Sequence, residues 1–259
     1  MDLGIAGRKA IVCASSKGLG RACALALAEA GCAVVLNGRD KEALERTARE
    51  LRQATGVEVR EILGDLDHAE TRAELIAACP DADILVNNNG GPPHKNFGEF
   101  SREDILKGIE SNMLTPIALA QALAPGMAQR KFGRIINITS SSVRAPNPGL
   151  DVSSGARAGL TAFLASAARL FARDNVTINA IQPGSFETDR AISGLVRAAA
   201  QRSVSVDVAR ADSKARIPAG RFGDPAEFGA LCAFLASAHA GFITGQNILV
   251  DGGAFPGAF

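Results

Sequence analysis

The sequence predicts a single α/β domain built on a doubly wound parallel sheet of about seven strands. Three observations support this prediction. Short runs of β-branched and aliphatic residues alternate along the chain with longer, alanine-rich segments of helical periodicity. Runs such as Ile84-Leu85-Val86 are continuously apolar, which is typical of parallel strands covered on both faces. No linker rich in Pro, Gly or Ser divides residues 1–259, so we expect one domain.

The expected strands and helices alternate in chain order. Strands are expected at residues 8–14, 33–38, 57–64, 83–88, 133–139, 176–182 and 247–250. The clearest helices are expected at residues 18–30, 41–53, 69–78, 115–128 and 154–173. In the last helix, apolar residues recur at i, i+3, i+4 and i+7, which predicts one buried face made of Leu160, Phe163, Leu164, Ala167, Leu170 and Phe171.

The composition excludes several classes of protein. Lys and Arg number 28 and Asp and Glu 27, and the resulting net charge of +1 argues against a protein that binds nucleic acid or a membrane surface. No apolar window is long enough to span a membrane, and the N-terminus lacks the pattern of a signal peptide, so we expect a cytoplasmic protein. The 5 cysteines form no CxxC pair, so we expect reduced thiols and no metal site.

Two loops follow predicted strands and depart from the regular pattern. Residues 90–99 contain Pro92 and Pro93 and form a stiff loop, and residues 185–216 are long and polar, with weak periodicity. In an open α/β sheet the loops beyond the carboxyl ends of the strands hold the ligand. We therefore expect residues 185–216 to act as a mobile lid over the substrate, and the alternative is an ordinary helical hairpin on the surface.

The first strand ends in a turn that suits a dinucleotide. The turn reads Cys13-Ala14-Ser15-Ser16-Lys17-Gly18-Leu19-Gly20, and a helix follows whose free N–H groups can face a pyrophosphate. After the second strand, Gly38 stands where NAD-dependent proteins carry an acidic residue, and Arg39 follows it. Because Lys17 and Arg39 can both approach a 2′-phosphate, we expect NADP(H) rather than NAD(H). Alternatively, Arg39 only pairs with Asp40 or Glu42.

These motifs resemble the classical short-chain dehydrogenase/reductase family, and in general pattern its 3-oxoacyl-carrier-protein reductase-like members. The resemblance covers nearly the whole chain and includes Asn87-Asn88-Asn89-Gly90, Pro183-Gly184-Ser185-Phe186-Glu187-Thr188 and the C-terminal Val250-Asp251-Gly252-Gly253, with Ala14 in place of the first glycine. It implies a Rossmann fold and a homo-oligomer, a tetramer or a dimer. It also implies cofactor contacts by Ala14, Ser15, Ser16, Lys17, Gly18, Leu19, Gly20, Asn37, Arg39, Asp65, Leu66, Asn88, Asn89, Gly90, Arg157, Pro183, Gly184, Phe186 and Thr188.

The catalytic centre that the resemblance implies is altered. The family's Asn and Ser correspond to Asn112 and Ser140, but its Tyr and Lys correspond to Ser153 and Arg157. The chain has 0 Tyr, so no shifted alignment restores the phenol. A serine hydroxyl is a far weaker acid than a phenol, and Arg keeps its proton. We therefore expect cofactor binding but a non-standard and slow reaction.

Three other groups could supply or steer a proton: His94, Arg144 and Asp151. The simpler interpretations, which we favour, are a solvated loop histidine, a surface arginine and a carboxylate at a helix N-terminus. The chain as a whole is best interpreted as an NADP(H)-dependent oxidoreductase of atypical mechanism, acting on an unidentified carbonyl or alcohol. The alternative is a catalytically silent nucleotide-binding sensor or partner subunit, and a plain scaffold is disfavoured.

Overall fold

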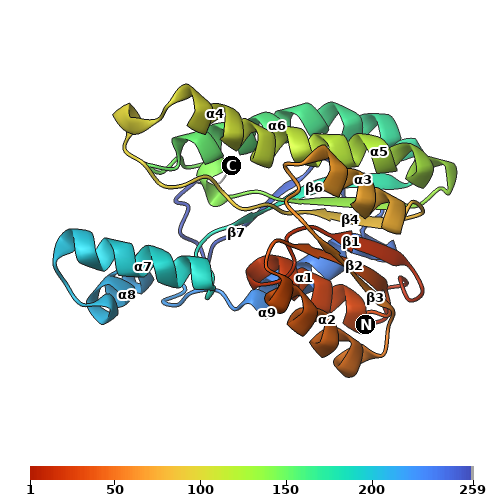
Figure 1. Cartoon of the computed structure of the whole chain (residues 1–259), viewed down its shortest axis with the longest axis horizontal. Helices are drawn as coiled ribbons and strands as arrows, with labels where there is room; N and C mark the ends of the chain where they lie inside the picture. Colours follow the sequence, from red (N-terminus) through yellow and green to blue (C-terminus); the bar gives the residue numbers. More distant parts are fainter. Residues whose placement is uncertain (258–259) are drawn as a thin grey trace.

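A computed structural model describes residues 1–257 and contains one parallel sheet between two layers of helices (Figure 1). The order of its 7 strands is β3-β2-β1-β4-β5-β6-β7, and each predicted strand agrees with an observed one to within about two residues at either end. This confirms the predicted fold class. The strands are β1 (Lys9–Val12), β2 (Ala33–Gly38), β3 (Val59–Leu63), β4 (Ile84–Asn87), β5 (Gly133–Ile138), β6 (Val176–Pro183) and β7 (Asn247–Val250).

The chain reverses its direction of winding between β1 and β4, which lie side by side in the middle of the sheet. Helices α1 (Gly18–Glu29), α2 (Lys41–Thr55) and α9 (Pro225–Ala236) cover one face of the sheet, and helices α3 (Ala69–Ala78), α4 (Arg102–Ile109), α5 (Thr115–Gln129) and α6 (Asp151–Phe171) cover the other (Figure 1). Each face carries its own apolar core. The crevice at such a switch point is where open α/β sheets bind ligands.

Helix α9 was not among the expected helices. Its residues are apolar on nearly every side because it packs against both the sheet and α1, so they show no amphipathic period. Its start follows ordinary rules, with Pro225 in the first turn and a capping box between Asp224 and Glu227.

Helix α6 begins three residues before the predicted start and buries only part of the face that was expected. Leu160 and Leu164 are buried as predicted, but Phe163 and Leu170 are 47% and 61% exposed. The prediction for these two residues was wrong because the apolar stripe is wider than the surface that the sheet covers. Nearer the N-terminus, the core-facing positions are held by polar residues, Ser153 and Arg157.

Residues 185–216 form a helical hairpin, α7 (Asp189–Arg202) and α8 (Val206–Ala215), that projects beyond the sheet on the left of Figure 1. Thr188 and Ser205 cap the N-termini of the two helices through their hydroxyls. Only one side of each helix is packed, around Leu195 and Ala209, which explains the weak periodicity. A helical hairpin is compatible with both expected alternatives, and movement as a lid over the substrate stays a prediction. No helix within residues 1–257 is long and apolar enough to cross a membrane.

Candidate active site

The turn between β1 and α1 brings the main chain close to itself. Ala14 and Gly18 both have left-handed backbones, with φ of 44° and 58°. A Cβ built on Gly20 would lie 2.4 Å from the carbonyl oxygen of Ala14, so only glycine fits there. No side chain caps the first turn of α1, and no acidic residue lies in it. Its N–H groups are therefore free to bind an anion such as a pyrophosphate.

Ser15 and Asn37 hold this turn in shape from inside the protein. The Asn37 amide donates to the carbonyl oxygens of Ile62 (3.1 Å) and Gly64 (3.2 Å), and its oxygen accepts from the N–H of Ala14 (3.2 Å). The Ser15 hydroxyl donates to the carbonyl oxygen of Val12 (2.7 Å) and accepts from the N–H of Asn37 (3.1 Å). Both side chains are buried and their polar atoms are occupied, so they shape the loop rather than reach into the crevice.

Two exposed ion pairs stand at the outer edge of the turn. Lys17 Nζ lies 2.9 Å from Asp40, and Arg39 Nη1 lies 3.2 Å from Asp65. Burial opposes ionisation of Asp65, but the N–H of Asp67 and the Arg39 guanidinium outweigh it and lower its pKa. Arg39 thus pairs with neither of the partners proposed for it from the sequence. At the position of Gly38, where NAD-dependent proteins carry an acidic side chain, this protein has none, and the nearby charged side chains of Lys17 and Arg39 are both basic.

The loop after β4 is tied to the first turn and to the helices above it. Asn88 Nδ2 donates to the carbonyl oxygen of Ala14 (3.1 Å), and Asn89 Nδ2 donates to Asp67 (3.0 Å). The carbonyl oxygen of Gly90 accepts from Asn112 Nδ2 (3.0 Å). Asn112 lies in a π-helical turn, Glu110–Leu114, that joins α4 and α5. Such turns are frequent at functional sites, because they direct one residue out of the helical register.

A buried polar network joins Asn112, Ser153 and Arg157. The Ser153 hydroxyl donates to Asn112 Oδ1 (3.3 Å) and accepts from Arg157 Nε (3.2 Å). The two terminal nitrogens of Arg157 donate to the carbonyl oxygens of Ile138 (2.5 Å) and Asn89 (3.3 Å), at the ends of β5 and β4. Burial, and then the positive charge of Arg190, lowers the pKa of Arg157 to about 10. Arg157 therefore remains charged at neutral pH.

Ser140 follows β5 and has a hydroxyl that the protein uses only as an acceptor. The N–H and the hydroxyl of Ser142 donate to Ser140 Oγ at 3.1 Å and 2.8 Å. The Ser140 proton has no acceptor among the described residues. It is consequently available to donate to a bound carbonyl or hydroxyl oxygen.

The segment after β6 closes the site opposite the first turn. Phe186 is buried and meets Phe228 edge to face, with ring centroids 5.4 Å apart, while Gly184 packs against Asp251. Thr188 caps α7 and lies beside Gly18, since a Cβ built on Gly18 would be 3.7 Å from Thr188 Cγ2. The N-termini of α1 and α7 therefore lie next to each other at one end of the sheet.

Comparison with known proteins agrees with this arrangement. A family profile described as enoyl-(acyl carrier protein) reductase matches residues 13–254. The chain is 32% identical over 259 residues to 3-oxoacyl-(acyl-carrier-protein) reductase FabG of Aquifex aeolicus, covering 98% of this chain and 100% of that protein. It belongs to the short-chain dehydrogenase/reductase family.

Solved structures of this family superpose over nearly the whole chain. L-sorbose reductase from Gluconobacter frateurii, solved with NADPH and L-sorbose, has a TM-score of 0.94 at 29% identity and covers 99% of this chain and 100% of its own. YwfH, an NADPH-dependent reductase involved in bacilysin biosynthesis, has a TM-score of 0.92 at 29% identity and covers 97% of this chain and 100% of its own. Members of the family with this fold thus bind NADPH.

The other three candidates for a proton donor in this short-chain dehydrogenase/reductase each have a local structural contact. Arg144 donates to Gln182 Oε1 (3.1 Å) and to the carbonyl oxygen of Asn247 (2.9 Å), which ties its loop to β6 and β7. Asp151 accepts from the N–H of Gly149 (3.0 Å). The ring of His94 lies against Gly149, in the space that a side chain there would need. Their simpler interpretations gain support from these contacts.

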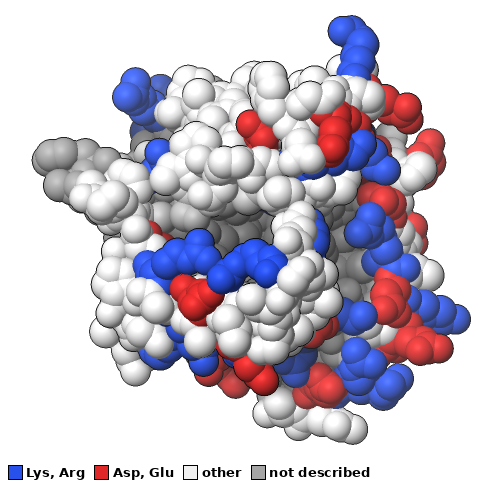
Figure 2. All heavy atoms as spheres, turned by 90° about the vertical axis from the view of Figure 1, so that its left-hand side faces the viewer, with Lys and Arg blue, Asp and Glu red and all other residues white. Residues whose placement is uncertain are grey.

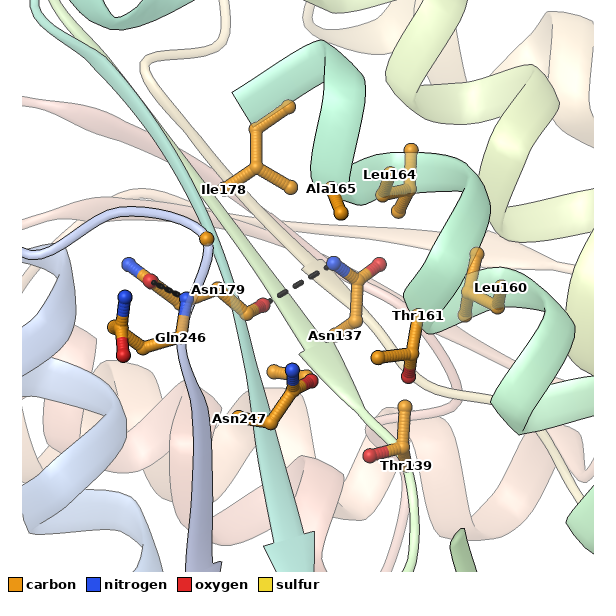
Figure 3. A pocket seen from close by; sticks show the side chains of 12 residues that line it. Asn137, Thr139, Leu160, Thr161, Leu164, Ala165, Ile178, Asn179, Gln246 and Asn247 are labelled. Atoms are coloured by element: carbon orange, nitrogen blue, oxygen red, sulfur yellow. Dashed lines mark hydrogen bonds between the residues drawn. The ribbon is translucent and has the colours of Figure 1, made fainter. Parts of the chain in front are cut away.

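Sequence reasoning missed a row of buried asparagines beneath the site. Asn87 Nδ2 donates to Asn137 Oδ1 (3.0 Å), Asn137 Nδ2 to the carbonyl oxygen of Asn179 (3.1 Å), and Asn179 Nδ2 to that of Ile243 (2.7 Å). Asn137 and Asn179 line a cavity of about 20 Å³ under α6, room for about one water molecule (Figure 3). A polar residue inside an apolar strand, as in Ile135-Ile136-Asn137-Ile138, was the available signal.

Arg190 was also missed. It lies in the first turn of α7, and its guanidinium rests on Gly91, where a built Cβ would be 2.5 Å from Arg190 Nη2. Its place directly after the Pro183–Thr188 motif was the signal that could have found it.

Proposed function

We propose that this protein is an NADP(H)-dependent oxidoreductase that interconverts a carbonyl and an alcohol on a small molecule. One observation carries the proposal: Asn89, which is expected to contact the nucleotide, also contacts the polar network of Ser153 and Arg157. Asn89 follows the strand that borders the first turn, and its carbonyl oxygen accepts from Arg157. A nucleotide bound at the first turn would therefore meet the polar network at the carboxyl ends of β4 and β5, where a hydride acceptor would lie.

The residues present fit NADP(H). The tight turn at Gly20 and the uncapped start of α1 suit the pyrophosphate, and Lys17 and Arg39 stand where a 2′-phosphate would be. When bound, the cofactor supplies a hydride to a carbonyl carbon. L-sorbose reductase, solved with NADPH, and the NADPH-dependent reductase YwfH share this fold. The turn that would hold the pyrophosphate is shaped by Ala14, Ser15, Ser16, Leu19 and Asn37. The residues expected around the nucleotide are Asp65, Leu66, Asn88, Gly90, Pro183, Gly184, Phe186 and Thr188.

In this proposal Ser153 and Arg157 occupy the places of the family's Tyr and Lys. Ser140 donates its free proton to the carbonyl oxygen, and Asn112 holds Ser153 in place. Arg157, still protonated at neutral pH, stabilises negative charge on that oxygen through the local field. The oxygen takes its proton from water, because neither a serine nor a charged arginine is a good acid here. A missing general acid costs ~10²–10⁴-fold in rate, so turnover is slow.

A second candidate function is a nucleotide-binding partner subunit or sensor without chemistry. The specific observation in its favour is that the Ser153 proton is already donated to Asn112 Oδ1. A hydroxyl engaged in this way leaves no donor at the position where the family places its acid.

The first experiment separates binding from turnover. The chain has 0 Trp, so the emission of added NADPH can be followed without protein background. Both candidate functions predict enhanced NADPH emission, and only the oxidoreductase predicts NADPH oxidation with a set of ketones, aldehydes and oxo acids. Absence of any nucleotide signal would refute both candidates.

The second experiment rewrites the network. The double variant Ser153→Tyr with Arg157→Lys restores the phenol and its ammonium neighbour, and we expect a rise of more than ~10-fold in reduction of an activated ketone. Ser153 is only 6% exposed, so NADPH emission must first show that the variant folds. If native turnover depends instead on His94 or Arg144, their alanine variants abolish it and the double variant lowers it.

We further propose that the protein is cytoplasmic and forms a homo-oligomer, a tetramer or a dimer. The exposed side chains of Phe163 and Leu170 support the oligomer, because they leave apolar surface on the outer side of α6 that a second copy of the chain could cover.

A further inference from the structure

Three arginines from distant parts of the chain converge on three consecutive residues of the loop after β4. Arg157 donates to the carbonyl oxygen of Asn89. Arg39 lies over Gly90, where a built Cβ would be 3.6 Å from its Nη2, and Arg190 rests against Gly91. The loop that borders the expected substrate position is therefore surrounded by positive charge.

Only one of these arginines is neutralised. Arg39 pairs with Asp65, whereas no carboxylate within residues 1–257 pairs with Arg157 or Arg190. The nearest acidic groups on Arg190's own segment point elsewhere: Glu187 pairs with Arg210 on α8, and Asp189 lines the groove between α1 and α9. The two charges act on each other, since Arg190 helps to lower the pKa of Arg157.

The face of α7 that carries Arg190 adds to the same field. Arg197 lies two helical turns further along this face, and after partial desolvation its charge is the second factor that lowers the pKa of Arg190. Figure 2 shows Lys and Arg side chains gathered along one edge of the hollow that opens toward the viewer. Uncompensated cations around a crevice raise the local concentration of anionic ligands.

We propose that the substrate is an oxo acid or hydroxy acid whose carboxylate is bound by Arg190. This proposal rests on the proposed function, and it specifies the class of substrate. Arg190 is an exposed residue whose guanidinium is partly desolvated and has no hydrogen-bond or ion-pair partner among the described residues. It can therefore bind a carboxylate through two parallel N–H bonds. Arg157 is committed to two carbonyl oxygens and Ser153, and it contributes charge but no further positioning contact.

The test measures binding rather than turnover. Protein saturated with NADP⁺ is titrated with 2-oxobutanoate, 3-oxobutanoate and 4-oxopentanoate, each against its own methyl ester. With oxidised nucleotide no hydride can be transferred, so the titration reports affinity alone. The three acids vary the separation of the carbonyl and the carboxylate, and each ester keeps the carbonyl while removing the charge.

We expect at least one acid to bind ~10–100-fold more tightly than its ester, as a charge-assisted bidentate contact provides. Arg190→Met should reduce this preference to below ~3-fold and Arg190→Lys should keep part of it. Arg173→Met is the matched control, because its side chain is 83% exposed at the far end of α6, and it should leave the preference unchanged.

Two results would overturn the proposal: equal binding of every acid and its ester, or a preference that survives in Arg190→Met. If Arg190→Met weakens NADP⁺ more than ~10-fold and leaves the preference intact, Arg190 binds a nucleotide phosphate instead. Failure of the unaltered protein to bind NADP⁺ or NADPH would count against the proposed function. The same titrations on nucleotide-free protein would then still decide whether the crevice selects a carboxylate.

Discussion

Replacing Ala14 by glycine should stabilise the protein, although glycine usually weakens a fold. Ala14 has φ of 44°, and a non-glycine residue in the left-handed region costs about 1–2 kcal/mol. Glycine removes this strain but loses about 0.5–1 kcal/mol through its greater freedom in the unfolded chain. The half-buried methyl group contributes about 0.4 kcal/mol that is also lost. At the middle of these ranges the expected net gain in the free energy of unfolding is about 0.4 kcal/mol.

The control is the same substitution where the backbone is regular. Ala73 is exposed in the middle of α3, and Ala73→Gly should cost about 1 kcal/mol. The two variants should therefore differ by about 1.4 kcal/mol in urea unfolding without nucleotide, which corresponds to about 3–6 °C in melting temperature. If Ala14→Gly destabilises the protein as much as Ala73→Gly does, the turn does not hold Ala14 in a strained conformation and the reasoning fails.

Three further predictions concern the cofactor, acid stability and assembly. Arg39→Asp should weaken NADPH and improve NADH relative to it, changing the ratio of the two dissociation constants by ~10-fold or more; equal effects on both nucleotides would refute the charge assignment. The pKa of Glu227 is lowered from 4.5 to about 2 by Arg221 and the N–H of Asp224, so its contribution to stability is complete above pH 4.5 and is lost as the pH falls toward 2. The difference in unfolding free energy between the unaltered protein and Glu227→Gln should accordingly shrink from pH 6 to pH 3, and a constant difference would disprove the linkage. Light scattering at micromolar concentration should give a tetramer or a dimer, and a monomer would contradict the proposed assembly.

The sequence by itself determined the fold class, and with it the end of the sheet at which a ligand site is expected. Alternating short apolar runs and amphipathic segments are local signals, because each strand or helix repeats its burial every two or 3.6 residues. The same holds for the turn at Gly18 and Gly20, whose residues are neighbours in the chain. The absence of tyrosine could also be established from composition alone, and it already argued against ordinary family chemistry.

The tertiary structure decided which distant side chains meet. No periodicity could place Arg39, Arg157 and Arg190 around residues 89–91. They lie just after β2, on α6 and on α7, and converge only because parallel strands end at one edge. The same limit explains Phe163. Its spacing in the sequence matches that of the buried residues of α6, but its side chain is exposed. A sequence pattern shows which residues are apolar, but not which side of a helix the rest of the protein covers. Helix α9 shows the converse: its residues are apolar even on the exposed side, where Phe234 is 37% exposed, so the sequence has no amphipathic pattern that would reveal the helix.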